Sequence, residues 1–149
     1  MCVIKKVYEK YNSLTNYLQD ISLFFGRLLV AYGFYEPAMM KWSNIESVAN
    51  WFSSINIPFP LLNAYMAATT EILGVVLLTL GLFIRVISLS LIIVMIVAIV
   101  SVHLSNGFSA GDNGFEIPLY YIGFLLMFMS FGAGKFSLDY FISSKQKKD

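Results

Sequence analysis

Four long apolar stretches alternate with short polar segments along the chain. Each stretch approaches the roughly 20 residues that a helix needs to cross a hydrocarbon core about 30 Å thick. The segments between them hold prolines, glycines, asparagines and serines, which favour turns. The pattern therefore predicts an all-α integral membrane protein, a four-helix bundle with spans at 21–40, 61–82, 86–104 and 117–136.

Two further segments show helical spacing of apolar residues among polar ones. Residues 3–18 have the pattern of an amphipathic helix on the membrane surface, with a frayed polar leader as the alternative. The loop after the first span predicts a short interfacial helix, anchored by Trp42 and Trp51 at headgroup depth, with an aromatic substrate-gating element as the alternative. The expected organisation is an amphipathic helix at 1–19, a membrane domain at 20–141 and a basic cytoplasmic tail at 142–149.

Composition and charge placement support a membrane location. Hydrophobic residues make up 58% of the 149 positions and charged residues 13%, whereas soluble domains carry about a quarter charged residues. The net charge of +1 gives no reason to expect nucleic-acid binding. Nine of the ten Lys and Arg residues fall on one side of the predicted spans, and Lys41 falls on the other. This asymmetry predicts that both termini are cytoplasmic.

Single cysteine and histidine residues limit the available chemistry. Cys2 alone excludes an intramolecular disulfide and a CxxC pair, and His103 alone excludes two-histidine haem ligation within one chain. No covalently bound cofactor is expected. The chain is therefore not expected to be an autonomous redox enzyme, although it could be a subunit of one.

Ionisable residues within a membrane span are candidates for function, because they cost several kcal/mol unless paired or hydrated. Arg27 and Glu71 fall at similar depths in the first two spans, and we expect them to form a buried ion pair. The pair is either structural, fixing the register of two helices, or part of a binding site.

A second polar group lies near the outer ends of the spans. It could form an interfacial belt, a small-molecule or quinone site, or, less in keeping with its spacing, a metal site. The candidates for ligand binding or a polar relay are, over both groups, Arg27, Glu36, Lys41, Glu71, His103, Glu116 and Tyr120.

Several motifs resemble the DoxX family. They are Arg27-Leu-Leu-Val with Lys41, Ala68-Thr-Thr-Glu-Ile-Leu-Gly74, the turn ending at Arg85, His103-Leu-Ser-Asn-Gly-Phe108 with Glu116, and Phe131-Gly-Ala-Gly-Lys-Phe-Ser-Leu-Asp139. Glu36-Pro37 departs from the His-Gly pair of many members. The resemblance covers about residues 20–141. It implies a four-helix bundle in a bacterial plasma membrane, and kinship with the DoxD subunit of thiosulfate:quinone oxidoreductase.

Three functions follow as hypotheses. The first is a membrane subunit of a quinone-linked redox or stress-related system. In it, Arg27 and Glu71 form a polar floor, and His103, Glu116 and Tyr120 exchange protons or bind the quinone ring. The second is a non-enzymatic anchor that recruits a soluble partner through the N-terminal helix, the Arg85 turn and the basic tail. The third is transport of a small molecule or metal, which would require a homodimer because four helices enclose little volume.

Overall fold

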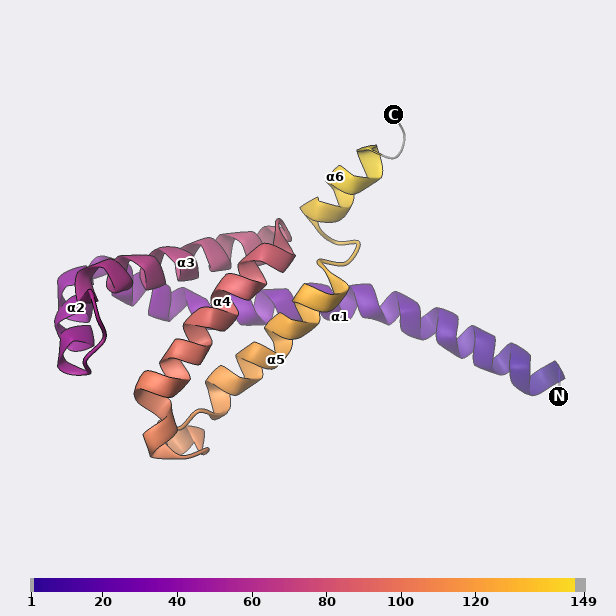
Figure 1. The fold of residues 1–149 in the computed structure, drawn as a ribbon. Helices are drawn as coiled ribbons and strands as arrows, with labels where there is room; N and C mark the ends of the chain where they lie inside the picture. Colours follow the sequence, from indigo (N-terminus) through magenta and orange to yellow (C-terminus); the bar gives the residue numbers. More distant parts are fainter. Residues whose placement is uncertain (1, 147–149) are drawn as a thin grey trace.

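The computed structural model describes residues 2–146, with the side chains of residues 2–4, 6 and 16 left outside that description (Figure 1). The tail residues 147–149 also lie outside the described part. No strand occurs in residues 2–146, which confirms the all-α prediction for this range. The helices are α1 (Cys2–Ser43), α2 (Ile45–Ser54), α3 (Pro60–Leu80), α4 (Ile84–Ala98), α5 (Glu116–Phe131) and α6 (Leu138–Gln146).

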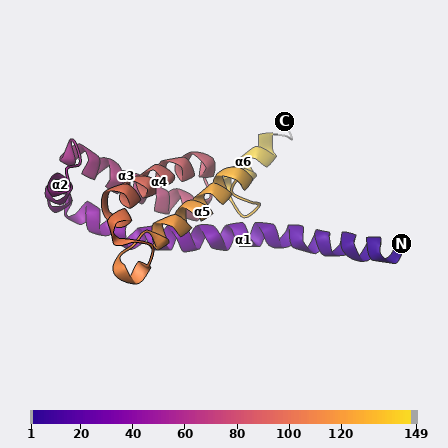
Figure 2. The same ribbon diagram turned by 60° about the horizontal axis from the view of Figure 1, so that its bottom comes forward.

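The first helix, α1, is 42 residues long and joins two elements that the sequence predicts as separate. Residues 3–18 are helical, but the helix continues without a break into the first predicted span. Before Pro37, α1 contains no proline, and its glycines stand singly. The helix therefore has no reason to end near residue 20. The N-terminal part of α1 extends away from the other helices in both views (Figures 1 and 2).

The short helix predicted in the first loop is confirmed as α2. Its buried residues Ala49 and Phe52 pack with Ala64 of α3 in a small separate apolar cluster. Helix α3 starts with a proline in its first turn, where the missing N–H costs nothing, and stops at Gly81. Gly81 adopts φ +68°, a left-handed conformation that glycine takes without strain. The tight turn predicted between the second and third spans is therefore present.

The last two predicted spans differ from the structure at their ends. After α4 the chain continues through a π-helical turn, Ile99–His103, and a 3-10 turn, Leu104–Asn106. Helix α5 ends at Phe131 rather than at residue 136, because Gly132 and Gly134 adopt positive φ angles and turn the chain toward α6. Two helical runs, Pro60–Leu80 and Ile84–Asn106, are long and apolar enough to cross a membrane, whereas α5 has 16 residues, or about 24 Å.

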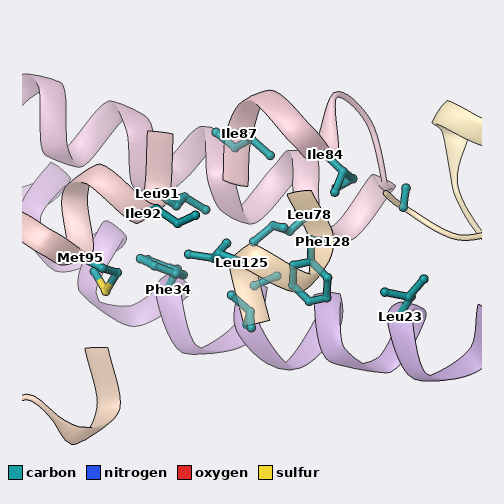
Figure 3. Close-up of a cluster of buried hydrophobic side chains, with 13 residues drawn as sticks. Leu23, Phe34, Leu78, Ile84, Ile87, Leu91, Ile92, Met95, Leu125 and Phe128 are labelled. Carbon is teal, nitrogen blue, oxygen red and sulfur yellow. The ribbon is translucent and has the colours of Figure 1, made fainter. Parts of the chain in front are cut away.

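The main core is shared by α1, α3, α4 and α5 (Figure 3). Phe34 of α1, Leu78 of α3, Leu91 of α4 and Phe128 of α5 are each at most 2% exposed. Gly74 brings α3 close to α4, since a Cβ atom there would lie 2.8 Å from Leu91 Cδ1. This packing fixes the helices that carry the polar residues described next.

Candidate functional site

An ion pair between Lys41 and Glu71 lies between α1 and α3. The Lys41 ammonium donates hydrogen bonds to both carboxylate oxygens of Glu71, at 3.0 Å and 2.8 Å. The Glu71 side chain is 2% exposed and the Lys41 side chain 19% exposed. The carboxylate is thus buried within the protein, while the ammonium keeps partial access to the surroundings.

The predicted ion pair between Arg27 and Glu71 is wrong, since Glu71 pairs with Lys41. The prediction compared the depths of the Cα atoms and neglected the direction of the side chains. Side chains on a helix lean toward its N-terminus. On α1 this direction carries the Lys41 ammonium inward to Glu71, and carries the Arg27 guanidinium away from Glu71 toward the C-terminal end of α3.

Arg27 binds backbone carbonyls at that end of α3. The side chain is fully buried, and its two terminal nitrogens donate to Leu78 O at 2.9 Å and Phe136 O at 2.6 Å. Its charge also lies 5.8 Å from the ring centroid of Phe24, a cation–π contact. Among the described residues Nε has no hydrogen-bond partner. Arg27 therefore joins α1 to the end of α3 and to the segment that follows α5.

Two aspartates hold the same segment, residues 132–139. Asp20 of α1 accepts a hydrogen bond from the Lys135 backbone N–H at 3.0 Å and forms an ion pair with Lys135 Nζ at 2.8 Å. This hydrogen-bonded ion pair lowers the pKa of Asp20 below its ordinary value. Asp139 accepts hydrogen bonds from the backbone N–H groups of Phe83 and Ile84, at the start of α4. Together with Arg27, these contacts fix α6 at one end of the helices.

At the other end, His103 lies in the π-helical turn after α4 and is half-buried. Its Nδ1 atom lies 2.8 Å from the backbone oxygen of Asn113, which also accepts a hydrogen bond from Asn106 Nδ2 at 3.2 Å. Because a carbonyl oxygen only accepts, this contact assigns the proton to Nδ1 and leaves Nε2 as an acceptor in the neutral ring. His103 thus ties the end of the α4 run to the loop before α5.

Glu116 and Tyr120 form a second contact near this loop. Glu116 accepts hydrogen bonds from the Ala110 backbone N–H and from the Tyr120 hydroxyl, each at 2.9 Å. Both carboxylate oxygens therefore have a partner within the chain. Tyr120 is one turn further along α5 and is half exposed.

The outer polar group predicted from the sequence is divided among separate contacts. Lys41 belongs with Glu71, His103 with Asn113, and Glu116 with Tyr120, while Glu36 is exposed on α1. Among the side chains that the structure describes, no three His, Cys, Asp or Glu residues gather where they could hold a metal ion. The hydrogen bonds of each side chain lead to a near neighbour, so a single outer site stays a prediction.

The parts played by Asp20 and Asp139 are not among the predictions from the sequence. Both lie outside the apolar stretches and read as ordinary surface charges. The motif from Phe131 to Asp139 was the available signal, since it holds two glycines, Asp139 itself and Lys135, the ion-pair partner of Asp20. A shallow groove between α1 and α3 was also missed, with a volume of about 210 Å³ and a lining of Leu28, Ala31, Tyr32, Tyr35, Val75 and Thr79.

Comparison with known proteins identifies the family. The family model for DoxX matches residues 22–104, more than half of the chain, so the chain belongs to the DoxX family. An uncharacterized protein of Haemophilus influenzae is 36% identical over 127 residues, covering 80% of this chain and 82% of that protein. No solved structure matches. The recognition made from the motifs is therefore confirmed.

Proposed function

We propose that the chain is a four-span protein of the bacterial plasma membrane with both termini in the cytoplasm. Membership of a membrane family and two helical runs of sufficient length support the membrane location. Residues 21–40 of α1 and helix α5 supply the other two crossings. The placement of nine of ten basic residues on one side of the predicted spans supports the orientation.

Cysteine accessibility in intact cells tests this topology. In a Cys2→Ser background, Asn56→Cys and Ser109→Cys should react with a membrane-impermeant maleimide added from outside. Ser144→Cys should react only after the membrane is permeabilised. Labelling of Ser144→Cys in sealed cells, or protection of the two loop positions, would contradict the topology.

Within this membrane protein we assign the function of an accessory subunit that presents a cytoplasmic platform to a soluble redox or stress-response partner. The observation that carries this proposal is the fixation of α6. Arg27, Asp20 and Asp139 all serve to hold the segment that leads into this helix. Burying a guanidinium costs free energy unless it is well paired. The use of Arg27 and two aspartates to hold this segment therefore indicates that the position of α6 matters for function.

The platform offers aromatic and basic groups to a partner. Tyr140 and Phe141 of α6 and Phe83 of the neighbouring turn are exposed, and Lys145 lies 5.4 Å from the Phe141 ring centroid. Exposed aromatic residues with an adjacent cation are common at the centres of protein interfaces. The internal pairing of Lys41 with Glu71 fits the same account, since a scaffold needs a fixed helix register.

Photo-cross-linking in native membranes tests the platform. A photoreactive phenylalanine analogue at Phe141 should yield a defined adduct with a soluble protein. The same analogue at Phe108, an exposed loop residue at the other end of the helices, provides the matched control. Adducts with lipid alone at Phe141, or the same protein adducts at both positions, would contradict the proposal.

Quinol binding near His103 is a second candidate, and the tautomer of His103 favours it. Because Nδ1 donates to Asn113 O, the neutral ring presents Nε2 as an acceptor for the hydroxyl of a quinol. Glu116 and Tyr120 would line the same end of the membrane domain. We therefore place the reduced form of the carrier, rather than the oxidised form, at this position.

Lipid-soluble carriers retained by the purified protein test this candidate. Wild-type protein in nanodiscs should retain quinol, and His103→Ala should lose it, whereas Glu36→Gln should retain it. Wild-type protein that holds no quinol and shows no measurable affinity for added quinol would rule out this site and leave the platform unaffected.

A further inference from the structure

One face of α1 carries an unbroken series of apolar residues at the spacing of a coiled coil. From residue 7 to residue 42, steps of four and three alternate along the helix and meet no charged residue. The positions are Val7, Tyr11, Leu14, Leu18, Ile21, Phe25, Leu28, Tyr32, Tyr35, Met39 and Trp42. This α1 seam has the heptad period by which two like helices wind around one another.

The structure leaves nine of the eleven α1 seam residues exposed, while Ile21 and Leu28 are half-buried. Val7, Tyr11, Leu14 and Phe25 are each more than 60% exposed, and Tyr32 is 83% exposed. The core face of α1 lies elsewhere, at residues such as Arg27 and Phe34. The seam is therefore available to a partner without disturbing the packing of α1 on the other helices.

The length of α1 shows why lipid alone does not account for this face. A helix of 42 residues is about 63 Å long, roughly twice the thickness of the hydrocarbon core. In the proposed topology residues 2–20 project from the membrane, and Figure 2 shows the N-terminal part of α1 running on past the other helices without a break. There the seam residues from Val7 to Leu18 meet water, where an exposed apolar stripe favours association.

Tyr32 gives a second reason within the membrane. It lies ten residues from Trp42, or about 15 Å along the helix, which is near the middle of a 30 Å core. A hydroxyl facing lipid at that depth lacks a hydrogen-bond partner, and this costs free energy. A second copy would bring another Tyr32 hydroxyl to the same depth.

We propose that the α1 seam binds the α1 seam of a second copy, giving a parallel homodimeric coiled coil that runs through the membrane and into the cytoplasm. This inference rests on the proposed topology. The bilayer itself imposes the parallel arrangement, because both copies are inserted in the same direction. A second α1 is the favoured partner for the α1 seam. It has the same heptad spacing, places its Tyr32 at the same depth and runs in the same direction through the membrane.

The area available is sufficient for a stable dimer. Nine seam residues expose about half or more of their side chains. With roughly 100 Å² exposed by each, the seam offers about 900 Å² per copy, near the 800 Å² per partner of a stable interface. No seam position is charged, so the contact line itself brings no like charges together.

Disulfide cross-linking in membranes tests the proposal. In a Cys2→Ser background, Leu14→Cys should form a covalent dimer at least about tenfold faster than Glu9→Cys, which lies on the opposite face of the same projecting segment. The reason is that a disulfide needs Cα atoms within about 7 Å, a distance that only seam residues reach. In nanodiscs, Tyr32→Phe should shift the monomer–dimer equilibrium toward the monomer relative to wild-type protein. Leu14→Lys should shift it further in the same direction.

Two results would overturn the dimer. One is equal cross-linking of Leu14→Cys and Glu9→Cys in protein that stays membrane-embedded. The other is strong quenching of a fluorophore at residue 14 by headgroup-attached quenchers, which would place the segment on the lipid surface. Alkaline extraction of the membranes separates a failure of the dimer from a failure of the topology. Protein that is monomeric but resists extraction would contradict the dimer and leave the proposed function intact.

Discussion

The ion pair between Lys41 and Glu71 makes an asymmetric prediction about stability. Replacing Lys41 by Met keeps the length of the side chain but leaves the Glu71 carboxylate, 2% exposed, without either of its hydrogen bonds. An uncompensated buried charge of this kind costs about 3–5 kcal/mol. Glu71→Gln should cost only about 1–2 kcal/mol, because the amide oxygen still accepts a hydrogen bond and the Lys41 ammonium can turn toward polar surroundings.

The double variant separates the charge from the packing. Lys41→Met with Glu71→Leu removes both charges, so its cost should fall below that of Lys41→Met alone. Reversible unfolding in mixed micelles measures all three free energies, with Trp42 and Trp51 as intrinsic fluorescence reporters. Lys145→Met, at an exposed lysine of α6, should change stability by less than about 0.5 kcal/mol. A Lys41→Met cost no greater than that of Glu71→Gln would refute the reasoning.

Three further changes test how the α6 segment is held. Gly81→Ala should destabilise the protein by at least about 2 kcal/mol, because φ is +68° and the added Cβ would collide with the Arg27 side chain. Arg27→Gln should speed hydrogen exchange and proteolysis in the segment from residue 132 to α6, since Phe136 O loses its donor. Asp20→Asn should lower the melting temperature more at pH 7 than at pH 3. The lowered pKa of Asp20 stabilises the folded state above the unfolded pKa, near 4, and this contribution disappears as the pH falls through the folded value.

Matched variants control these tests. Gly123→Ala adds a Cβ that meets nothing within 4 Å, so it should leave stability unchanged or slightly raised. Lys10→Gln alters an exposed lysine in the N-terminal part of α1 and should not change exchange in α6. A loss of stability for Gly81→Ala no larger than for Gly123→Ala would contradict the close contact at the α3–α4 turn. A pH-independent effect of Asp20→Asn would contradict the part assigned to its ion pair with Lys135.

The amino-acid sequence by itself determined the helical class, the helix in the first loop and the family. Apolar stretches and turn residues are local signals, and helix formation depends mainly on local backbone bonds and on the face that must be buried. The same local signals did not predict where some of the helices begin and end. Gly132 and Gly134 ended α5 early, and the absence of any breaker near residue 20 merged two predicted helices into α1.

Only the tertiary structure decided which charges meet. Arg27, Lys41 and Glu71 were all identifiable as unusual residues in apolar surroundings, yet their pairing depended on the direction of each side chain and on the register of α1 against α3. The partners of Arg27 are backbone carbonyls, which every residue carries and no sequence pattern marks. Asp139 likewise binds backbone N–H groups 55 and 56 residues away, a contact that exists only because folding brings α6 to the start of α4.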